Sequence, residues 1–514
     1  MKNKLFKSIL SITFGCALIM GNSGCKKLSD FGDINTRNDA ASVPVTSYLL
    51  TNVESQMGTF MTAGITPSLF AQMFSETQYT DVSLYQIPQI NFGGIYSGPL
   101  EDLQTIIDLN TDPLTRGSLA VSTSGSNGNQ LAIARILKAY IFWTVTDRWG
   151  DVPYTEALRG SKFLTPKYDK QEDIYKDLLK ELKESISNFD GGTNAKGDIF
   201  YSGTPAKWKK VANTLRMLIS LRMSKQFPDP GQYAATEFSA AALDPNGSVI
   251  TNADNVTQTY DGSTAITTNP FYNTLVGRKD YAFSLTFSNI LTNLGDSRRA
   301  SFATPGPAFP YGLIRNDAVL FDNSVGTNPA RPFALKTQTT PVVIIPAAYT
   351  LLAMAEAVQR GWVTIPGQTA EILYNSGVTA SFAQWGATGA AAYLSLGGAA
   401  NFNSGAGGGS NIGTNSYGSI VGSDALTPTP LSRINLQRYI ASFGDGIQAW
   451  SSWRRSGVPN LKPSTFGSNT PKEIPRRYTY GLGEYANNPA NVAAAAARFA
   501  GGDIASARIY WDKP

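Results

Sequence analysis

Apolar residues recur at helical spacing in several separate segments of this 514-residue chain. The clearest segment is 130–146, where Ile133, Ile136 and Tyr140 fall on one face of a helix with 3.6 residues per turn. Leu131 and Ile141 add apolar groups to other faces, which is typical of a helix covered on most sides. Residues 130–146 are therefore predicted to form an internal helix.

Other stretches carry the same signal. Residues 170–189 are amphipathic, with an apolar residue at every fourth position along one face. In residues 203–227, Thr204 suits the N-cap and Pro205 suits the first helical position. Further helices, of which the first two would form a hairpin, are predicted within residues 342–363, 369–386 and 431–457.

Two regions interrupt this helical pattern. Residues 227–340 and 386–430 are rich in Gly, Asn and other turn formers, and have few long periodic runs. A single helix pair cannot bury its apolar faces alone, so the pairs are expected to stack. Residues 46–514 are thus predicted to be a mainly α domain, in which helix pairs pack against a loop-rich, irregular half with few short strands.

The N-terminus has the features of a secretory signal. Three lysines precede the uncharged segment 8–20, which is shorter than the roughly 20 residues needed to span a bilayer. Ser23 and Gly24 then stand before Cys25, as at a lipoprotein cleavage site, although Asn22 replaces the usual leucine. Residues 1–24 are predicted to be removed and residues 25–45 to form a tether with acyl (palmitate-type) chains on Cys25, which would hold the protein on a membrane. An ordinary signal peptide followed by an unrelated cysteine is the alternative.

Composition excludes several kinds of chemistry. The chain has no histidine, which removes Ser-His-Asp triads, Cys-His pairs and the usual ligands of catalytic zinc. Loss of the three signal lysines lowers the formal net charge from +5 to +2, and no basic run follows, so no nucleic-acid partner is expected. Neither a phosphate-binding loop nor a dinucleotide motif is present, and no cofactor is predicted.

Three polar patterns have a functional and a structural interpretation. Asp147 and Asp151 would suit a glycosidase only if they faced each other across a cleft; a helix C-terminus and turn is the alternative. The oxygen-rich segment 190–198 does not have the spacing of an EF-hand, and no metal site is assigned. The last pattern is a set of arginines that would either bind an anion or tie late loops to helix ends: Arg454, Arg455, Arg476 and Arg477.

Several motifs together resemble the SusD/RagB family of nutrient-binding outer-membrane lipoproteins. The most specific is TDRWGDVPYTEAL at 146–158. Other matching segments follow in the same order as in the family, at 166–175, 198–224, 351–363, 373–386, 453–459 and 474–480, and FGDINTRNDA at 31–40 fits the segment after the lipidated cysteine.

The resemblance implies tetratricopeptide-like helix pairs packed against the loop-rich half. It also implies an outer-membrane location facing the exterior and a partner, a SusC-like TonB-dependent β-barrel transporter that the lipoprotein covers. The implied ligand is an oligosaccharide or another nutrient, bound without catalysis.

Aromatic rings in loops are the natural candidates for sugar binding, because the apolar face of a pyranose stacks on a ring while polar groups hold its hydroxyls. Trp143, Trp208 and Trp450 lie in predicted helices and are assigned to the core. The predicted ligand-binding residues are Tyr79, Tyr85, Asn91, Phe92, Tyr96, Phe271, Tyr272, Arg278, Tyr281 and Phe283.

These observations favour a lipid-anchored binding protein that passes nutrients to a transporter. Two alternatives stay open at this point. One is a surface glycosidase that uses a carboxylate pair, and the other is a structural lid of the transporter that binds no ligand itself.

Overall fold

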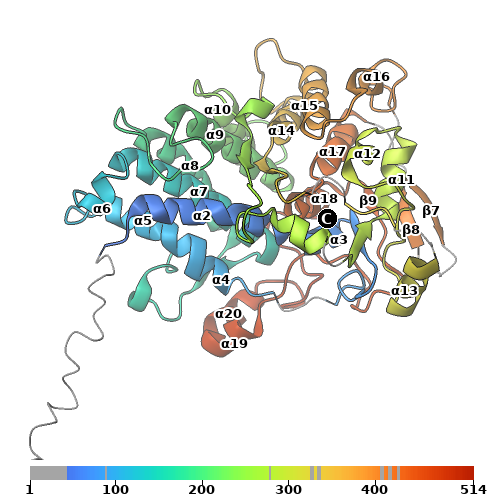
Figure 1. The fold of residues 1–514 in the computed structure, drawn as a ribbon, viewed down its shortest axis with the longest axis horizontal. Helices are drawn as coiled ribbons and strands as arrows, with labels where there is room; N and C mark the ends of the chain where they lie inside the picture. Colours follow the sequence, from blue (N-terminus) through green and yellow to red (C-terminus); the bar gives the residue numbers. More distant parts are fainter. Residues whose placement is uncertain are drawn as a thin grey trace, which may run out of the picture. The chain divides into compact units, whose positions relative to one another are not determined.

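The long helices of the first half lie side by side (Figure 1). The computed structural model describes residues 43–86, 90–276, 279–324, 329–332, 337–405, 410–414, 420–424 and 429–514, and Thr46–Pro514 form one compact unit. Within it α7 packs against α5 and α8, α8 against α9, and α9 against α10. The bounds of this array are α2 (Thr46–Thr62), α5 (Glu101–Thr111), α7 (Asn127–Trp149), α8 (Gln171–Asn188), α9 (Pro205–Arg222) and α10 (Tyr233–Ala242).

Helix α7 is the internal helix that the apolar pattern predicts. The Ser126 side chain caps it by accepting a hydrogen bond from the Asn129 backbone N–H, and its residues are buried on almost every face. It ends at Gly150, whose φ of +84° favours glycine. A Cβ there would lie 2.9 Å from Cζ of Phe499, so this position also lacks room for a side chain.

A second group of helices continues the stack. Helices α14 (Ala347–Gln359) and α15 (Ala370–Gln384) form the predicted hairpin, and α14 packs against α9 and α17 (Pro430–Ala441). Helix α18 (Gly446–Ser456) packs against α17, α7 and α3 (Ile65–Phe70). The mainly α architecture with stacked helix pairs is therefore confirmed.

Residues 342–345 differ from the sequence interpretation. They form strand β6 (Val342–Ile345), not the start of a helix, and pair with β4 (Val256–Gln258). The run of β-branched residues suits a strand. Pro346 then takes the N-cap position of α14, so the helix begins only at Ala347.

The described strands are short and all pair antiparallel. Strand β1 (Phe74–Glu76) pairs with β5 (Tyr281–Phe283), and β2 (Val152–Pro153) pairs with β3 (Tyr168–Asp169). Strand β8 (Ile420–Asp424) lies between β7 (Ser410–Thr414) and β9 (Asn460–Leu461). The β1–β5 pair joins segments that lie far apart in the sequence, whereas β2 and β3 lie close together in the chain, between α7 and α8.

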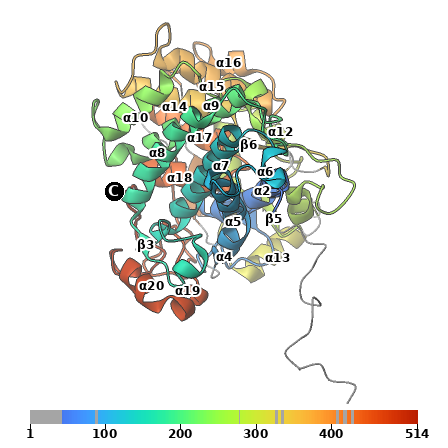
Figure 2. The ribbon, with the colours of Figure 1, turned by 90° about the vertical axis from the view of Figure 1, so that its left-hand side faces the viewer.

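Shorter helices cover the ends of the unit. In both ribbon views α19 (Leu482–Asn487) and α20 (Pro489–Ala496) lie at the end opposite α16 (Ala390–Leu394) (Figures 1 and 2). Within the described part of the chain, no helix combines the length and apolar character needed to cross a bilayer. The remaining helical segments are α4 (Gly93–Ile95), η2 (Tyr96–Leu100), α6 (Leu119–Ser122), η3 (Gly160–Lys162), η4 (Met223–Lys225), η5 (Asn252–Asp254), η6 (Tyr272–Val276), α11 (Leu285–Asn293), α12 (Arg298–Phe302) and α13 (Arg315–Ser324).

Candidate functional site

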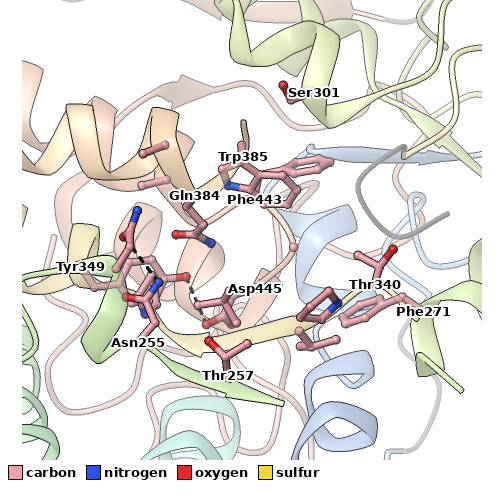
Figure 3. Close-up of a pocket in the computed structure, with 18 residues that line it drawn as sticks. Asn255, Thr257, Phe271, Ser301, Thr340, Tyr349, Gln384, Trp385, Phe443 and Asp445 are labelled. Carbon is pink, nitrogen blue, oxygen red and sulfur yellow. Dashed lines mark hydrogen bonds between the residues drawn. The ribbon is translucent and has the colours of Figure 1, made fainter. Parts of the chain in front are cut away.

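A cavity of about 470 Å³ lies between the α14–α15 hairpin, the turn from α17 to α18, and strands β4 and β6. We call it the first chamber; Figure 3 shows its lining. Its size falls within the range of small-molecule sites, roughly 300–1,000 Å³. Its rings are Phe271, Tyr349, Trp385 and Phe443, and its polar groups come from Asn252, Asn255, Thr257, Ser301, Thr340, Gln384 and Asp445.

Trp385 is the ring that is available to a ligand. It stands at the C-cap of α15 and is half-buried, whereas Phe271 and Phe443 are buried. Its ring packs edge-on against Phe443 and Phe302, with centroids 5.4 and 4.9 Å apart. The turn at Gly444, with φ of +89°, passes beside the same ring, and the Trp385 side chain is partly exposed. Such a fixed aromatic surface is suited to stacking against the apolar face of a sugar.

Asp445 supplies a carboxylate at the floor of the chamber. Its Oδ1 accepts the Gln448 backbone N–H at 3.1 Å and so caps α18, and Tyr349 donates its hydroxyl to Oδ2 at 3.2 Å. Burial raises the pKa of Asp445 to about 6, although Tyr349 and the charge of Arg222 oppose the rise. At neutral pH this carboxylate is mainly ionised and accepts hydrogen bonds.

Two asparagines in the chamber lining are held in place by hydrogen bonds to helices α14 and α15. Asn255 Oδ1 accepts the Ala347 backbone N–H at 2.8 Å, which fixes it to the start of α14. Asn252 donates to the Ala380 carbonyl at 3.0 Å, which fixes it to α15. In the view of Figure 3 Gln384 extends between Trp385 and Asp445. Amides and a carboxylate around an aromatic ring can bind hydroxyl and amide groups, and this set provides no nucleophile with an adjacent base.

The sequence-predicted ligand residues are not brought together at this chamber. Of them only Phe271 lines it, and Arg278 lies outside the described residues. Tyr79 is 51% exposed, with the guanidinium of Arg315 5.1 Å from its ring centroid. Tyr272 and Tyr281 are half-buried near the loop-rich half.

Several of the predicted residues have structural contacts. Tyr85, Phe92 and Phe283 are buried in the core, where their ring faces are covered by other side chains. Asn91 is exposed, but its Oδ1 accepts the Gly93 backbone N–H at 2.6 Å. Tyr96 donates its hydroxyl to the Pro153 carbonyl at 2.6 Å. These contacts do not support a ligand role for the three buried rings.

The two aspartates of the TDRWGDVP segment do not form a catalytic pair in a cleft. Asp147 is fully buried and accepts hydrogen bonds from Trp511 Nε1 at 2.9 Å and from the Tyr175 hydroxyl. Asp151 accepts the Gln171 backbone N–H at 2.8 Å and pairs with Arg498. Their carboxylates are used to hold the fold, as the structural interpretation predicts.

The late arginines are also structural. Arg455 makes two hydrogen bonds to Glu356, at 2.7 and 2.6 Å, and Arg454 donates to the Asp147 carbonyl at 2.8 Å. Arg476 pairs with Asp512, and Arg477 pairs with Asp503. They tie the C-terminal segment to helix ends, which confirms the structural alternative.

The oxygen-rich segment 190–198 holds turns. Asp198 accepts the Gly203 backbone N–H and Trp208 Nε1, each at 2.7 Å, and Asp190 accepts the Ser126 hydroxyl at 2.7 Å. Among the residues that the structure describes, no three acidic or cysteine side chains gather as a metal site would need.

Comparison with known families agrees with this arrangement. A sequence profile of a SusD-like family, described as starch-binding and associating with the outer membrane, matches residues 37–481. The chain belongs to the SusD-like family. A search of curated proteins found no match.

Solved structures of SusD-like proteins share the fold. A chitin-binding protein is 26% identical, with a TM-score of 0.72 over 91% of this chain and 100% of its own. A SusD homolog from Bacteroides uniformis is 25% identical, with a TM-score of 0.75; the match covers 91% of this chain and 100% of the homolog. A chitin-binding SusD homolog from Flavobacterium johnsoniae is 22% identical, with a TM-score of 0.71; the match covers 91% of this chain and 98% of the homolog.

Sequence reasoning missed Trp385, Gln384 and Asp445, the groups that give the first chamber its chemistry. Trp385 and Gln384 lie at the end of a predicted helix, where apolar residues are usually core. A usable signal was the position of Trp385 directly before Gly386, since a helix that stops there leaves the ring beside a loop.

Proposed function

We propose that this SusD-like chain is a lipid-anchored glycan-binding protein of the outer membrane. The observation that carries the proposal is the first chamber, where the partly exposed Trp385 ring stands among the amide and carboxylate groups of Asn255, Gln384 and Asp445. This combination matches the amphipathic character of a sugar, which has apolar ring faces and hydroxyls at its edge. The ligand is bound and released without a change of covalent bonds.

The proposed ligand is a β-linked oligomer of N-acetylglucosamine. The likeness to a 26% identical chitin-binding protein supports this choice. The family description instead names starch, so malto-oligosaccharides are the competing ligands. The acetamido group adds an amide that the side chains of Asn255 and Gln384 are able to bind.

Delivery to a transporter completes the proposal. The Cys25 lipid would hold the protein on the outer membrane, facing the exterior, and a SusC-like TonB-dependent barrel would receive the glycan. Pull-down of tagged, full-length protein from native membranes is expected to recover a large β-barrel protein. Recovery of the lipoprotein alone would argue against this partner.

Calorimetry tests the ligand and its site. The wild-type protein is expected to bind N-acetylglucosamine oligomers with higher affinity than malto-oligosaccharides of equal length. Trp385→Ala should weaken that binding by about two- to tenfold, since stacking on an aromatic ring contributes about 0.5–1.5 kcal/mol. Tyr79→Ala is the matched control, because its ring is exposed but lies outside the first chamber. Loss of binding in Tyr79→Ala alone would place the site near Tyr79 and outside the first chamber.

A further inference from the structure

A second cavity of about 750 Å³ adjoins the first chamber. We call it the second chamber. Asn252 and Ala383 line both cavities, so these residues form the boundary between them. The other lining residues of the second chamber are Ile250, Leu351, Met354, Ile365, Pro366, Gln368, Leu373, Asn375, Ser376, Thr379 and Ala380.

The two chambers differ in chemistry. The first chamber has aromatic rings, whereas the lining of the second has none among the described residues. Its floor consists of buried aliphatic groups from Leu351, Met354 and Leu373. At its rim stand the exposed hydroxyls of Ser376 and Thr379. An aliphatic floor favours small apolar substituents, and a hydroxyl rim favours the polar groups beside them.

The boundary is held in place by hydrogen bonds. Asn252 donates to the Ala380 carbonyl on α15 at 3.0 Å, and Asn255 donates to Asn252 Oδ1 at 3.4 Å. Ala383 has only a methyl side chain and is exposed. A ligand chain passing from one chamber to the other therefore crosses Asn252 and Ala383, the two residues that line both.

We propose that the second chamber binds further units of the oligosaccharide whose other end occupies the first chamber. Its aliphatic floor takes acetamido methyl groups, and its rim binds the neighbouring hydroxyl and amide groups. This inference rests on the proposed function, because it concerns the same ligand. It adds that affinity increases with chain length and depends on N-acetylation in the second chamber.

Two variants on α15 separate the chambers. Thr379→Trp puts a large side chain at the rim of the second chamber, at an exposed helical position. Ile372→Trp is the matched control, since Ile372 is 45% exposed on the same helix and lines neither chamber. Both substitutions leave the buried faces of α15 unchanged, and far-ultraviolet circular dichroism with a thermal melt checks that each variant folds like the wild type.

Calorimetry with N-acetylglucosamine oligomers of two to six units is the test. The wild type should bind the hexamer about tenfold or more tightly than the dimer, a difference of ~1.4 kcal/mol. Thr379→Trp should remove this gain and leave dimer affinity unchanged, while Ile372→Trp keeps the gain. Fully de-N-acetylated hexamers should show little gain in the wild type.

The outcomes distinguish the two levels of the proposal. If the dimer binds through Trp385 but Thr379→Trp does not affect the hexamer, the second chamber is not a subsite and the proposed function still holds. An equal loss for dimer and hexamer in Thr379→Trp also overturns the inference. If the wild type binds none of these oligomers, the proposed function fails, and this inference fails with it.

Discussion

The Tyr349 hydroxyl donates to Oδ2 of Asp445 across 3.2 Å, and this bond joins the first turn of α14 to the N-terminus of α18. Tyr349 is 9% exposed and Asp445 is 6% exposed, so the pair forms part of the chamber floor and is largely shielded from water. The carboxylate therefore links the packing of two helices to the chemistry of the site.

Glycan affinity should depend on pH through Asp445. Burial raises its pKa to about 6, and its titratable or charged neighbours are Tyr349, Tyr140 and Arg222. Below this pKa the carboxyl is protonated and accepts hydrogen bonds poorly. We expect affinity to be constant above pH 7 and to fall by about tenfold towards pH 5, as the ionised fraction falls.

Calorimetry from pH 5 to 8 measures this dependence. Asp445→Asn is the control, because asparagine also caps helices but does not titrate. Its affinity should be independent of pH. The free energy of unfolding should depend on pH in the opposite direction. Because the folded state raises the pKa of Asp445, this carboxyl group favours folding most below its unfolded-state pKa, and its contribution to stability falls as pH rises through about 6. An equally steep decline of affinity in Asp445→Asn would show that another group is responsible.

Removing the charge of Glu356 should destabilise the fold strongly. Glu356 is fully buried and pairs with Arg455 at 2.6 Å and Arg360 at 2.9 Å. Glu356→Gln leaves buried guanidinium charge uncompensated, a change that costs about 3–5 kcal/mol. Denaturant unfolding measures the free energy. Lys176→Ala, which breaks an exposed pair with Glu172, should cost about 1 kcal/mol or less.

The ion pairs of Glu356 also predict that the free energy of unfolding decreases in acid. Burial opposes the ionisation of Glu356, but Arg455 and Arg360 hold its pKa well below the usual range. Its contribution is present above the unfolded-state pKa of about 4.3 and is lost progressively as pH falls below it. The loss should be absent in Glu356→Gln, whose unfolding free energy should change less between pH 6 and pH 3 than that of the wild type.

Gly150→Ala should destabilise the end of α7. The residue has φ of +84°, and a Cβ would lie 2.9 Å from Phe499 and 3.0 Å from Ile509. Gly150 also has ψ of −119°, outside the left-handed helical region, so backbone strain of about 1–3 kcal/mol adds to overpacking of about 1–3 kcal/mol. Gly160 has a positive φ of +55°, but a Cβ there would have no atom within 4 Å. Gly160→Ala therefore introduces backbone strain without steric overlap. Equal melting temperatures for the two variants would contradict the steric argument.

Acylation of Cys25 is predicted to anchor the protein to the membrane. Cys25→Ala should move the protein from the membrane fraction to the soluble fraction of the cell envelope, because no acyl chain would then be attached. Mass spectrometry of the wild-type N-terminus should show a mass increase at Cys25 that corresponds to acyl groups. An unmodified cysteine in membrane-bound protein would show that another contact holds the chain there.

The sequence pattern predicts the helices, because their apolar periodicity is local. It does not predict the residues of the first chamber. The faces of α7 and α8 follow from their own residues, since each apolar position recurs along one helix. Strand β6 was missed because its partner β4 lies more than 80 residues earlier and local pattern does not show such pairing.

The candidate rings show the same limit. Phe283 and Trp385 are both aromatic residues beside irregular segments, yet Phe283 is fully buried and Trp385 is half-buried. The Phe283 ring is covered by Phe287 from the following helix and by Phe443 from a distant segment of the chain. Exposure of a ring is a property of the assembled fold, and aromatic positions alone did not identify which rings would be available.

The contacts behind Trp385 have a consequence for the thermodynamics of binding. With Phe302 and Phe443 on its edges, the indole has its orientation before any ligand arrives. A ring that is already immobile loses little rotamer entropy when a sugar is placed on it. The stacking surface is therefore preorganised, and more of the interaction energy with a sugar is available for affinity.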